Sequence, residues 1–514
     1  MVGAETLLRT LVNSGVKVCF ANPGTSEMQF VAAVDRVPGM RPVLGLFEGV
    51  VAGAADGYGR MADGPAATLF HLGPGLANGL ANLHNAMRAR TPIVNLVGDH
   101  ATYHRPYDSP LASDVAAYAR PVSGWLRSSG DARMIGADTQ AAVNAAWGPP
   151  GQIATLIVPA DCSWNPGGEP GPGATRPLPR AVSTGALERA ATALDAGEQT
   201  LFLINGRALR ADGLRAAARL TRHTGARVLA DTFTPRLERG AGIPGIERFP
   251  RYPDKAAAVM ADVKHLFLVE TVPPVAFFAY PDQPSWLTPE NYTIHTLAAP
   301  GEDVVAALET LCEVTGAPRV DAGAELAVPE PATGALTPDT VAQTVAANLL
   351  EGAIVADEAV TSRASLPSMT AGCPAHDWLS LTGGALGQSL SAAAGAAIAC
   401  PDRPVLCLQA DGAGMYAPQA LWTMVREGLN VTVLIYANRT YRILHNEHAR
   451  LGLGEVGEAA RRLLDIGDPE LDWTHIARGM GMPAVRVTDN ASLHSELAIA
   501  LGEPGPRLIE AVLQ

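Results

Sequence analysis

Short apolar runs alternate with longer segments of helical periodicity along the whole chain. This alternation is typical of parallel α/β structure, in which each buried strand is followed by a helix that covers one face of the sheet. In the first part of the chain, the predicted strands cover residues 16–21, 43–47, 66–71, 93–98 and 154–158. The later predicted strands cover residues 200–205, 227–231, 266–269, 292–296, 353–357, 379–381, 405–409, 432–437 and 507–512.

Two segments rich in proline and glycine, residues 164–179 and 318–338, interrupt this alternation. A chain of 514 residues is also too long for one ordinary hydrophobic core. We therefore expect an α/β fold with three doubly wound parallel-sheet domains, over residues 1–165, 180–318 and 338–514. The first and last parts share a faint repeat, in which a glycine-rich turn leads through a helix to an apolar strand.

Composition and charge exclude several classes of function. The net charge of −13 and the lack of a basic tract argue against a nucleic-acid partner. The chain has no apolar run long enough to span a membrane and no apparent signal peptide, so we expect a cytoplasmic protein. The six cysteines are scattered without a CxxC pair, which is typical of small core residues and not of a zinc site or a disulfide framework.

The strongest chemical signal lies in the last third of the chain. Asp411 follows one predicted strand after a single alanine, and Asn438 directly follows the next. Because parallel strands finish at the same edge of a sheet, the two side chains can meet there. Carboxylate, amide and carbonyl oxygens suit Mg²⁺ that also contacts the phosphates of a ligand. The alternative is a turn aspartate and a strand-end asparagine without a ligand.

Glu48 is the second signal, since it is the one charged residue in a stretch of apolar and small residues, 44–55. At the end of a strand such a carboxylate is poorly solvated, which is typical of a group that exchanges protons in catalysis. The alternative is a helix N-cap carboxylate that backbone N–H groups satisfy.

The Asp411-Gly412 pair followed by Asn438 resembles the cofactor motif of thiamine diphosphate-dependent enzymes. Ala410 and Ala437 replace a glycine and a first asparagine of the usual motif, and neither change removes a metal ligand. The resemblance spans nearly the whole chain and is strongest to the acetolactate synthase and benzoylformate decarboxylase group. It implies thiamine diphosphate and Mg²⁺ as cofactors, with Asp411, Asn438 and the carbonyl of Thr440 as metal ligands.

The resemblance also implies a role for each domain and for the remaining cofactor residues. The first domain would bind the aminopyrimidine, where Glu48 shares a proton with the ring, and the last would bind the diphosphate and the metal. Gly384 would accept a hydrogen bond from the 4′-amino group, and Leu386 would force the two rings of the cofactor into a V. The other predicted cofactor contacts are Asn22, Pro23, Gly24, Thr25, Glu358, Thr361, Gly412, Ala413 and Tyr441.

Histidines at two strand ends are the candidates for substrate chemistry. His71 matches the active-site histidine of benzoylformate decarboxylase. His104 falls roughly at the position where pyruvate decarboxylases carry the first histidine of a pair, and Arg105 stands where they carry the second. Such side chains can move protons or hold a carboxylate at neutral pH. Loop histidines can equally be plain surface groups. The other predicted substrate contacts are Thr25, Gln388, Ile443 and Leu444.

The function that this resemblance implies is decarboxylation of a small 2-oxo acid and carboligation of the product to a second carbonyl, from an aldehyde or another 2-oxo acid. Three alternatives remain: a simple 2-oxo acid decarboxylase, a flavin-linked oxidase and a non-catalytic cofactor-binding protein. The middle domain has no clear flavin fingerprint, so FAD is not predicted. The family builds each site across a dimer interface, so we expect at least a homodimer and, by family habit, a homotetramer.

Overall fold

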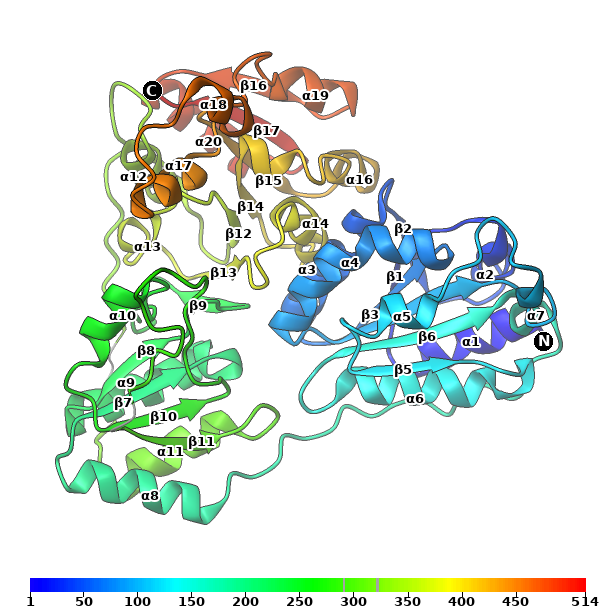
Figure 1. The fold of residues 1–514 in the computed structure, drawn as a ribbon, viewed down its shortest axis with the longest axis horizontal. Coiled ribbons are helices and arrows are strands. Elements are labelled where there is room, and N and C mark those ends of the chain that lie inside the picture. The colour runs from blue at the N-terminus through cyan, green and yellow to red at the C-terminus, as the bar shows by residue number, and fades with distance from the viewer. Residues whose placement is uncertain (290–291, 320–322) are drawn as a thin grey trace.

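Three β-sheets, each covered by helices, divide the chain into three α/β domains in the computed structural model, which describes residues 1–289, 292–319 and 323–514 (Figure 1). The predicted fold class is therefore confirmed. The predicted linker over residues 318–338 includes residues 320–322, which lie outside the described residues.

The first sheet has six parallel strands in the order β2-β1-β3-β4-β6-β5. Its strands are β1 (Val18–Asn22), β2 (Arg41–Leu44), β3 (Ala66–Phe70), β4 (Ile93–Asp99), β5 (Trp125–Ser128) and β6 (Ile153–Pro159). Its helices are α1 (Gly3–Asn13), α2 (Met28–Val34), α3 (Glu48–Ala62), α4 (Leu72–Ala89), α5 (Val115–Ala119), α6 (Ile135–Trp147) and α7 (Ala160–Trp164). The prediction missed β5.

The central sheet has four parallel strands in the order β11-β10-β7-β8. Its strands are β7 (Thr200–Ile204), β8 (Arg227–Ala230), β10 (His265–Val269) and β11 (Thr293–Ala298). The helices of this region are α8 (Thr184–Asp195), α9 (Ala211–Thr224), α10 (Pro253–Met260) and α11 (Val304–Val314). All four strands lie within two residues of the predicted ranges.

The third sheet has seven strands in the order β16-β17-β15-β14-β12-β13-β9. Its strands are β9 (Leu237–Arg239), β12 (Ile354–Glu358), β13 (His376–Ser380), β14 (Val405–Ala410), β15 (Val431–Ala437), β16 (Ala484–Val487) and β17 (Arg507–Val512). Its helices are α12 (Pro338–Asn348), α13 (Leu366–Met369), α14 (Gln388–Ala399), α15 (Asp411–Gly414), α16 (Ala420–Glu427), α17 (Arg442–Arg450), α18 (Glu458–Leu464), α19 (Trp473–Gly479) and α20 (Asn490–Gly502).

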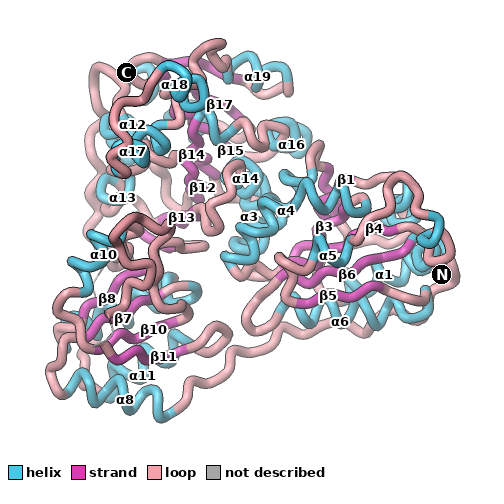
Figure 2. The backbone as a smooth tube through the Cα atoms, viewed as in Figure 1, coloured by secondary structure: helices cyan, strands magenta, loops and turns pink. Residues whose placement is uncertain are grey.

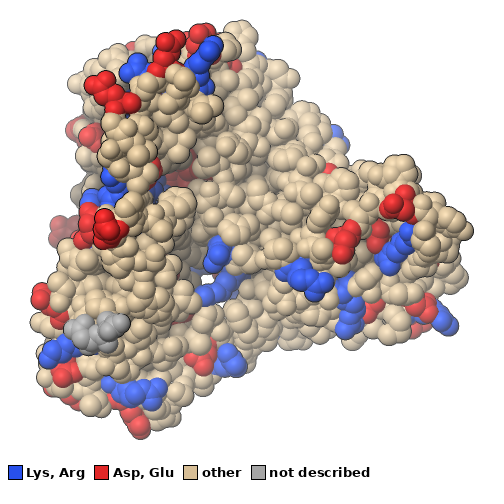
Figure 3. Space-filling view, viewed as in Figure 1, with Lys and Arg blue, Asp and Glu red and all other residues tan. Residues whose placement is uncertain are grey.

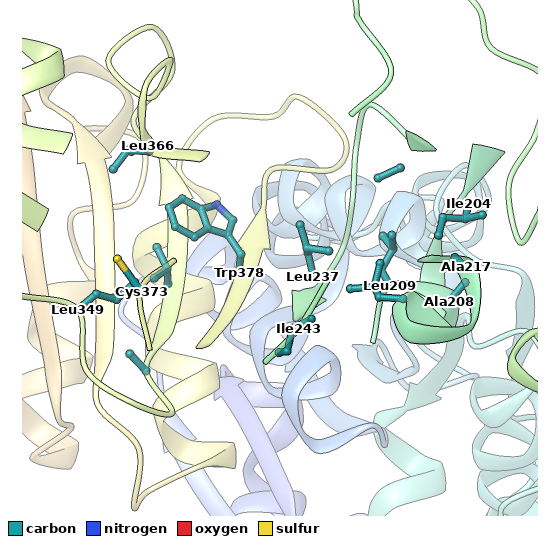
Figure 4. Packing of buried hydrophobic residues seen from close by; sticks show 14 of the residues in the cluster. Ile204, Ala208, Leu209, Ala217, Leu237, Ile243, Leu349, Leu366, Cys373 and Trp378 are labelled. Carbon is teal, nitrogen blue, oxygen red and sulfur yellow. The ribbon is translucent and has the colours of Figure 1, made fainter. Parts of the chain in front are cut away.

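β9 comes from the middle of the chain but pairs antiparallel with β13 at the edge of the third sheet. Leu237 of this strand belongs to one continuous buried cluster with Trp378 of β13 and Leu209 of the central domain (Figure 4). The central and third domains therefore share a hydrophobic core, which the division of the sequence into separate domains did not predict.

The first and third domains meet where α3 packs against α14 (Figures 1 and 2). Glycines make this contact close. A Cβ atom added at Gly57 would lie 2.0 Å from the carbonyl oxygen of Ala392, and one added at Gly395 would lie 1.8 Å from that of Ala54. The two helix backbones touch directly, so the positions of α3 and α14 relative to each other are fixed.

A cavity of about 1050 Å³ opens between the central domain and the other two. Several arginines line it, among them Arg60, Arg90 and Arg210. Figure 3 shows lysine and arginine atoms beside a hollow on this face. Across the described ranges, no helix is both long and apolar enough to cross a membrane.

Candidate active site

The turn after β1 forms one wall of the predicted site in the first domain. Asn22 ends this strand, and its Nδ2 donates a hydrogen bond to the carbonyl of Gly45, 2.9 Å away, in the loop that leads to α3. Pro23 and Gly24 follow, and Thr25 begins a short 3-10 helix (Thr25–Glu27) with its side chain exposed. The predicted cofactor turn is thus tied to the segment that carries Glu48.

His71 directly follows β3 and precedes α4. Its Nδ1 lies 2.8 Å from Oε2 of Glu27, a carboxylate that is only 3% exposed. The imidazole also presses on the turn after β1, since a Cβ atom added at Gly24 would lie 2.3 Å from the ring. The structure therefore brings His71 beside the predicted cofactor turn, and it adds Glu27, to which sequence reasoning gave no role.

Glu48 is the first residue of α3, and its side chain is half-buried in the single chain. Its Oε2 accepts a hydrogen bond from Nδ2 of Asn78 on α4, at 3.0 Å. Phe47 holds the N-cap position, so Glu48 is not the N-cap carboxylate of the alternative reading. A Cβ atom added at Gly75 would lie 3.1 Å from Oε1 of Glu48 and 3.5 Å from Cβ of His71, so both candidates lie close to Gly75.

His104 and Arg105 lie in the loop after β4, at the same edge of the sheet. Arg105 donates from Nη2 to Oδ2 of Asp99 at 2.6 Å and lines a cavity of about 430 Å³. His104 is exposed, with its ring centroid 5.4 Å from that of His100. The loop continues to Ser113, whose Oγ occupies the space of a Cβ at Gly73, so this segment packs against the turn after His71.

Asp411 meets the Asn438–Thr440 turn at the edge of the third sheet, as the sequence predicts. β14 and β15 are parallel neighbours, with Ala410 paired to Tyr436. Oδ2 of Asp411 accepts the backbone N–H of Arg439 at 2.6 Å, and burial raises the pKa of this carboxyl. Oδ1 of Asn438 accepts the N–H of Thr440 at 3.1 Å.

These groups fit a hard cation. Among the hydrogen bonds of the described residues, none is accepted by the carbonyl of Thr440. Asp411 and the Asn438–Thr440 turn thus bring carboxylate, amide and carbonyl oxygens to neighbouring strand ends, and these are the donor types that Mg²⁺ prefers. The described residues contain no group of three or more His, Cys, Asp or Glu side chains that could hold a metal ion.

Glu358 lies at the end of β12 and is 2% exposed. Its carboxylate accepts the N–H groups of Gly387 and Ser389, at 2.7 and 2.8 Å, and Nε2 of Gln409 at 3.0 Å. Burial raises the pKa of Glu358 to about 7. These hydrogen bonds hold the segment that carries Gly384 and Leu386. Within this chain, Glu358 therefore stabilises the predicted cofactor segment.

Gln388 is the first residue of α14 and is 2% exposed. Its Nε2 donates to Oδ2 of Asp56 on α3. The structure therefore uses this amide, predicted as a substrate contact, in the contact between the first and third domains.

The remaining predicted residues lie along the same edge of the third sheet. Thr361 is half-buried in the turn after β12, and Leu386 is half-buried after Gly384. The ring of Tyr441 packs on Gly412, where an added Cβ atom would lie 2.5 Å from it. Gly412 and Ala413 lie in α15, while Ile443 and Leu444 lie in α17, where Leu444 is exposed.

Within one chain the two groups of residues remain apart. The segment with Leu386 rests on α4, where Nδ2 of Asn85 donates to the carbonyl of Ala385 at 2.8 Å. Asn85 lies seven positions beyond Asn78, the partner of Glu48, which is about 10 Å along a helix. Asn85 and Asn78 are further residues that sequence reasoning missed, since the pattern of α4 alone does not show which residues face the third domain.

The fold and the candidate site are those of a three-domain α/β protein whose predicted cofactor residues lie at the edges of its outer sheets. Residues 1–117 match the family description "Thiamine pyrophosphate enzyme, N-terminal TPP binding domain". Residues 366–511 match "Thiamine pyrophosphate enzyme, C-terminal TPP binding domain". The chain belongs to this family, whose cofactor is also called thiamine diphosphate.

Relatives of known name span the whole chain. It is 52% identical over 522 residues to "Putative acetolactate synthase large subunit IlvX" of Mycobacterium tuberculosis, covering 100% of this chain and 99% of the relative. It is 27% identical over 536 residues to benzoylformate decarboxylase of Pseudomonas aeruginosa, covering 97% and 96%. The solved structure of 4-hydroxybenzoylformate decarboxylase from Rhodococcus jostii RHA1 has the same fold, with a TM-score of 0.83 at 22% identity over 100% and 99% of the two chains.

Proposed function

We propose that this protein catalyses Mg²⁺- and thiamine diphosphate-dependent decarboxylation of a small 2-oxo acid and joins the product to a second carbonyl. The observation that carries this proposal is the placement of Glu48 and His71 beside Gly75 at one sheet edge and the contact of Asp411 with the Asn438–Thr440 turn at the other. The acceptor is an aldehyde or a second 2-oxo acid. The full-length relative at 52% identity supports the carboligase type.

The residues of the chain have separate tasks in this proposal. Asp411, Asn438 and the Thr440 carbonyl would hold Mg²⁺, and the turn at Asn22 with Gly384 and Leu386 would orient the rings of the cofactor. When bound, thiamine diphosphate supplies a nucleophilic carbon and accepts the electron pair that loss of CO₂ releases. Glu48 holds or releases a proton at its Oε1, and His71 does so at its Nε2. Arg105 and His104 would contact the substrate.

In this proposal a second copy of the chain completes the site. The protein would form at least a homodimer and, as is usual in the family, a homotetramer. The separation of the two groups within one chain supports this arrangement, because Glu48 and the segment with Leu386 lie about two helical turns apart along α4. We assign the protein to the cytoplasm, supported by six cysteines that are all free thiols. FAD is not part of the proposal.

A simple decarboxylase is the second candidate, which the full-length benzoylformate decarboxylase relative favours. To separate the two, the protein is incubated with thiamine diphosphate, Mg²⁺ and pyruvate, 2-oxobutyrate or benzoylformate, alone and with aldehydes, and the products are followed by NMR. An acyloin or acetolactate supports carboligation, and free aldehyde alone supports the decarboxylase. If no acid is consumed while the cofactor is bound, the proposed donor class is wrong.

Two variants test the assigned roles in the same assay. Glu48→Gln keeps the shape of the side chain but cannot move a proton, so we expect bound cofactor and a turnover lower by a factor of about 10² to 10⁴. Glu503→Gln, on the exposed end of α20, serves as the control and should match the wild type. Wild-type turnover in Glu48→Gln would refute the role of Glu48.

Asp411→Ala removes the only carboxylate of the proposed metal site. We expect it to lose thiamine diphosphate in equilibrium dialysis with Mg²⁺, while its far-UV circular dichroism stays that of the folded protein. Retention of the cofactor at wild-type affinity, or retention without Mg²⁺, would contradict the metal assignment.

A further inference from the structure

Glu27 has an unusual environment for a carboxylate, because it is almost fully buried and receives hydrogen bonds only from uncharged or histidine donors among its described contacts. Its Oε2 accepts the N–H of Gly24 at 2.8 Å, and its Oε1 accepts the hydroxyl of Ser26 at 2.9 Å. The third partner is Nδ1 of His71, 2.8 Å from Oε2. The side chain of Glu27 is 2% exposed and that of His71 is 24% exposed. Glu27 therefore faces inward and His71 faces the site.

The backbone fixes both side chains. A Cβ atom added at Gly98 of β4 would lie 1.6 Å from Oε1 of Glu27, so the carboxylate lies directly against the strand. On the other side, Gly24 presses on the ring of His71. The chain then turns sharply at Leu72, which has a φ of +51° and is 1% exposed. A buried leucine rarely adopts this left-handed conformation, so packing must hold the turn that aims His71.

We infer that Glu27 is a positioning residue that holds His71 in the tautomer with the proton on Nδ1, which leaves Nε2 as the nitrogen that faces the substrate. An ionised carboxylate only accepts hydrogen bonds, so the Nδ1 that faces it must carry a proton. The opposite tautomer would place the Nδ1 lone pair against a buried negative charge. The partner of one ring nitrogen thus sets the state of the other.

Among the described contacts, few other charged groups lie near the imidazole of His71. Glu48 lies across Gly75, where its carboxylate accepts a hydrogen bond from Asn78. Asp99, at the end of the neighbouring strand β4, pairs with Arg105 and accepts the N–H of His100. Ser26 Oγ lies 3.3 Å from Nδ1, farther than Glu27, and its proton is directed to Glu27. Glu27 is therefore the group that decides the tautomer.

This inference rests on the proposed function, since a fixed Nε2 matters only if His71 moves a proton at the substrate. A neutral imidazole with the lone pair on Nε2 can accept a proton there, and the resulting imidazolium can return it. Loss of the Nδ1 partner would lower turnover while it leaves the remaining substrate contacts in place.

The tautomer can be measured without any substrate. Solid-state ¹⁵N spectra of histidine-labelled protein at pH 8.5 separate protonated from unprotonated ring nitrogens, at a pH where imidazoles are ordinarily neutral. The chain has 12 histidines, so the difference between the wild type and His71→Gln isolates the signal of His71. We expect Nδ1–H in the wild type. In Glu27→Met, only the Ser26 hydroxyl remains to donate to Nδ1, so we expect the signal of Nε2–H.

Ser26→Ala is the matched control, because it removes the other group near Nδ1 and should keep the Nδ1–H signal. If Glu27→Met does not fold, Glu27→Asp keeps the charge but withdraws the carboxylate by one methylene, and we expect a mixture of tautomers. An Nε2–H signal in the wild type, or an unchanged Nδ1–H signal in folded Glu27→Met, would overturn the inference.

Kinetics then connects the tautomer to turnover. We expect kcat of Glu27→Met to fall by about ten- to a hundredfold with KM within about threefold, whereas Glu27→Gln, whose amide oxygen still accepts from Nδ1, stays within about threefold of the wild type. A change of tautomer without any effect on kcat would overturn the link to catalysis. If the wild type shows Nδ1–H but consumes no 2-oxo acid, the proposed function fails and the positioning role of Glu27 stands.

Discussion

Asp56 and Arg60 form a fully buried ion pair at the contact between the first and third domains. Their side chains are 0% and 2% exposed, and Arg60 donates from Nε and Nη2 to the carboxylate at 2.8 and 2.6 Å. Asp56 also accepts hydrogen bonds from Thr91 and Gln388, and Arg60 donates to the carbonyl of Ser380 at 2.8 Å. One network thus joins α3, α14 and β13.

Asp56→Ala would leave the guanidinium of Arg60 buried without its counter-charge. Breaking a buried ion pair from one side costs about 3–5 kcal/mol, which is more than a hundredfold in the folding equilibrium. Arg60→Met should cost a similar amount, since it leaves the carboxylate unpaired. Replacing both by apolar residues, Asp56→Leu with Arg60→Met, removes both charges, so we expect a cost of only about 1–3 kcal/mol from the unpaired carbonyl and hydroxyl partners.

Urea unfolding at pH 7.5 without cofactor, followed by circular dichroism, measures these differences as shifts of the midpoint at constant slope. The pair of Glu503 and Arg507 is the exposed control, because it has the same four-residue separation, across the turn between α20 and β17, but side chains 62% and 34% exposed. Breaking it should cost less than about 1 kcal/mol. If Asp56→Ala costs no more than Glu503→Ala, or if the double variant is as unstable as the sum of the single ones, the reasoning about the buried pair is wrong.

Two further predictions concern the same interior. Burial raises the pKa of Glu358 from 4.5 to about 7, so between these pH values the unfolded chain loses a proton that the folded chain keeps. The free energy of unfolding should therefore fall by about 1.4 kcal/mol per pH unit as the pH rises through this window, about 3 kcal/mol in total. Glu358→Gln should lack this slope in urea unfolding from pH 4.5 to 7.5. An equal slope in both proteins would contradict the assignment. Gly395→Ala should destabilise the protein by about 3 kcal/mol or more in the same assay, because its Cβ meets the backbone of α3, whereas Gly502→Ala, with open space at the end of α20, should be neutral or slightly stabilising.

The sequence was sufficient for the buried strands but not for the edge strands. β14 and β15 are continuous apolar runs whose residues are almost all buried, and both were predicted to within one residue. β5 and β16 were missed because each is short, partly exposed and carries an arginine, Arg127 or Arg486, so neither shows a buried apolar run. β9 has only three residues, and its partner strand lies more than a hundred positions away.

In the candidate site, too, the sequence revealed residues with a local pattern and missed those whose partners are distant in the chain. Glu48 and Asp411 were found because each is an isolated carboxylate at a strand end, a local feature that periodicity exposes. Asp56 gave no such signal, since it sits inside a helix and its partner Gln388 is 332 positions away. Only the packing of α3 on α14 brings the two together. Sequence reasoning therefore assigned Gln388 to a pocket, whereas the structure uses it between domains.

The rigid contact of α3 with α14 also explains why a single chain keeps its two groups of site residues apart. The start of α3 carries Glu48, while the part that touches α14 begins at Gly53, five residues and about 8 Å further along the helix, where an added Cβ atom would lie 2.5 Å from Cβ of Ser391. Since the glycines at this contact leave no space for the helices to slide, Glu48 cannot approach the segment with Leu386 of its own chain without loss of the buried Asp56–Arg60 pair. The same packing that stabilises the monomer therefore favours a site completed by a second copy.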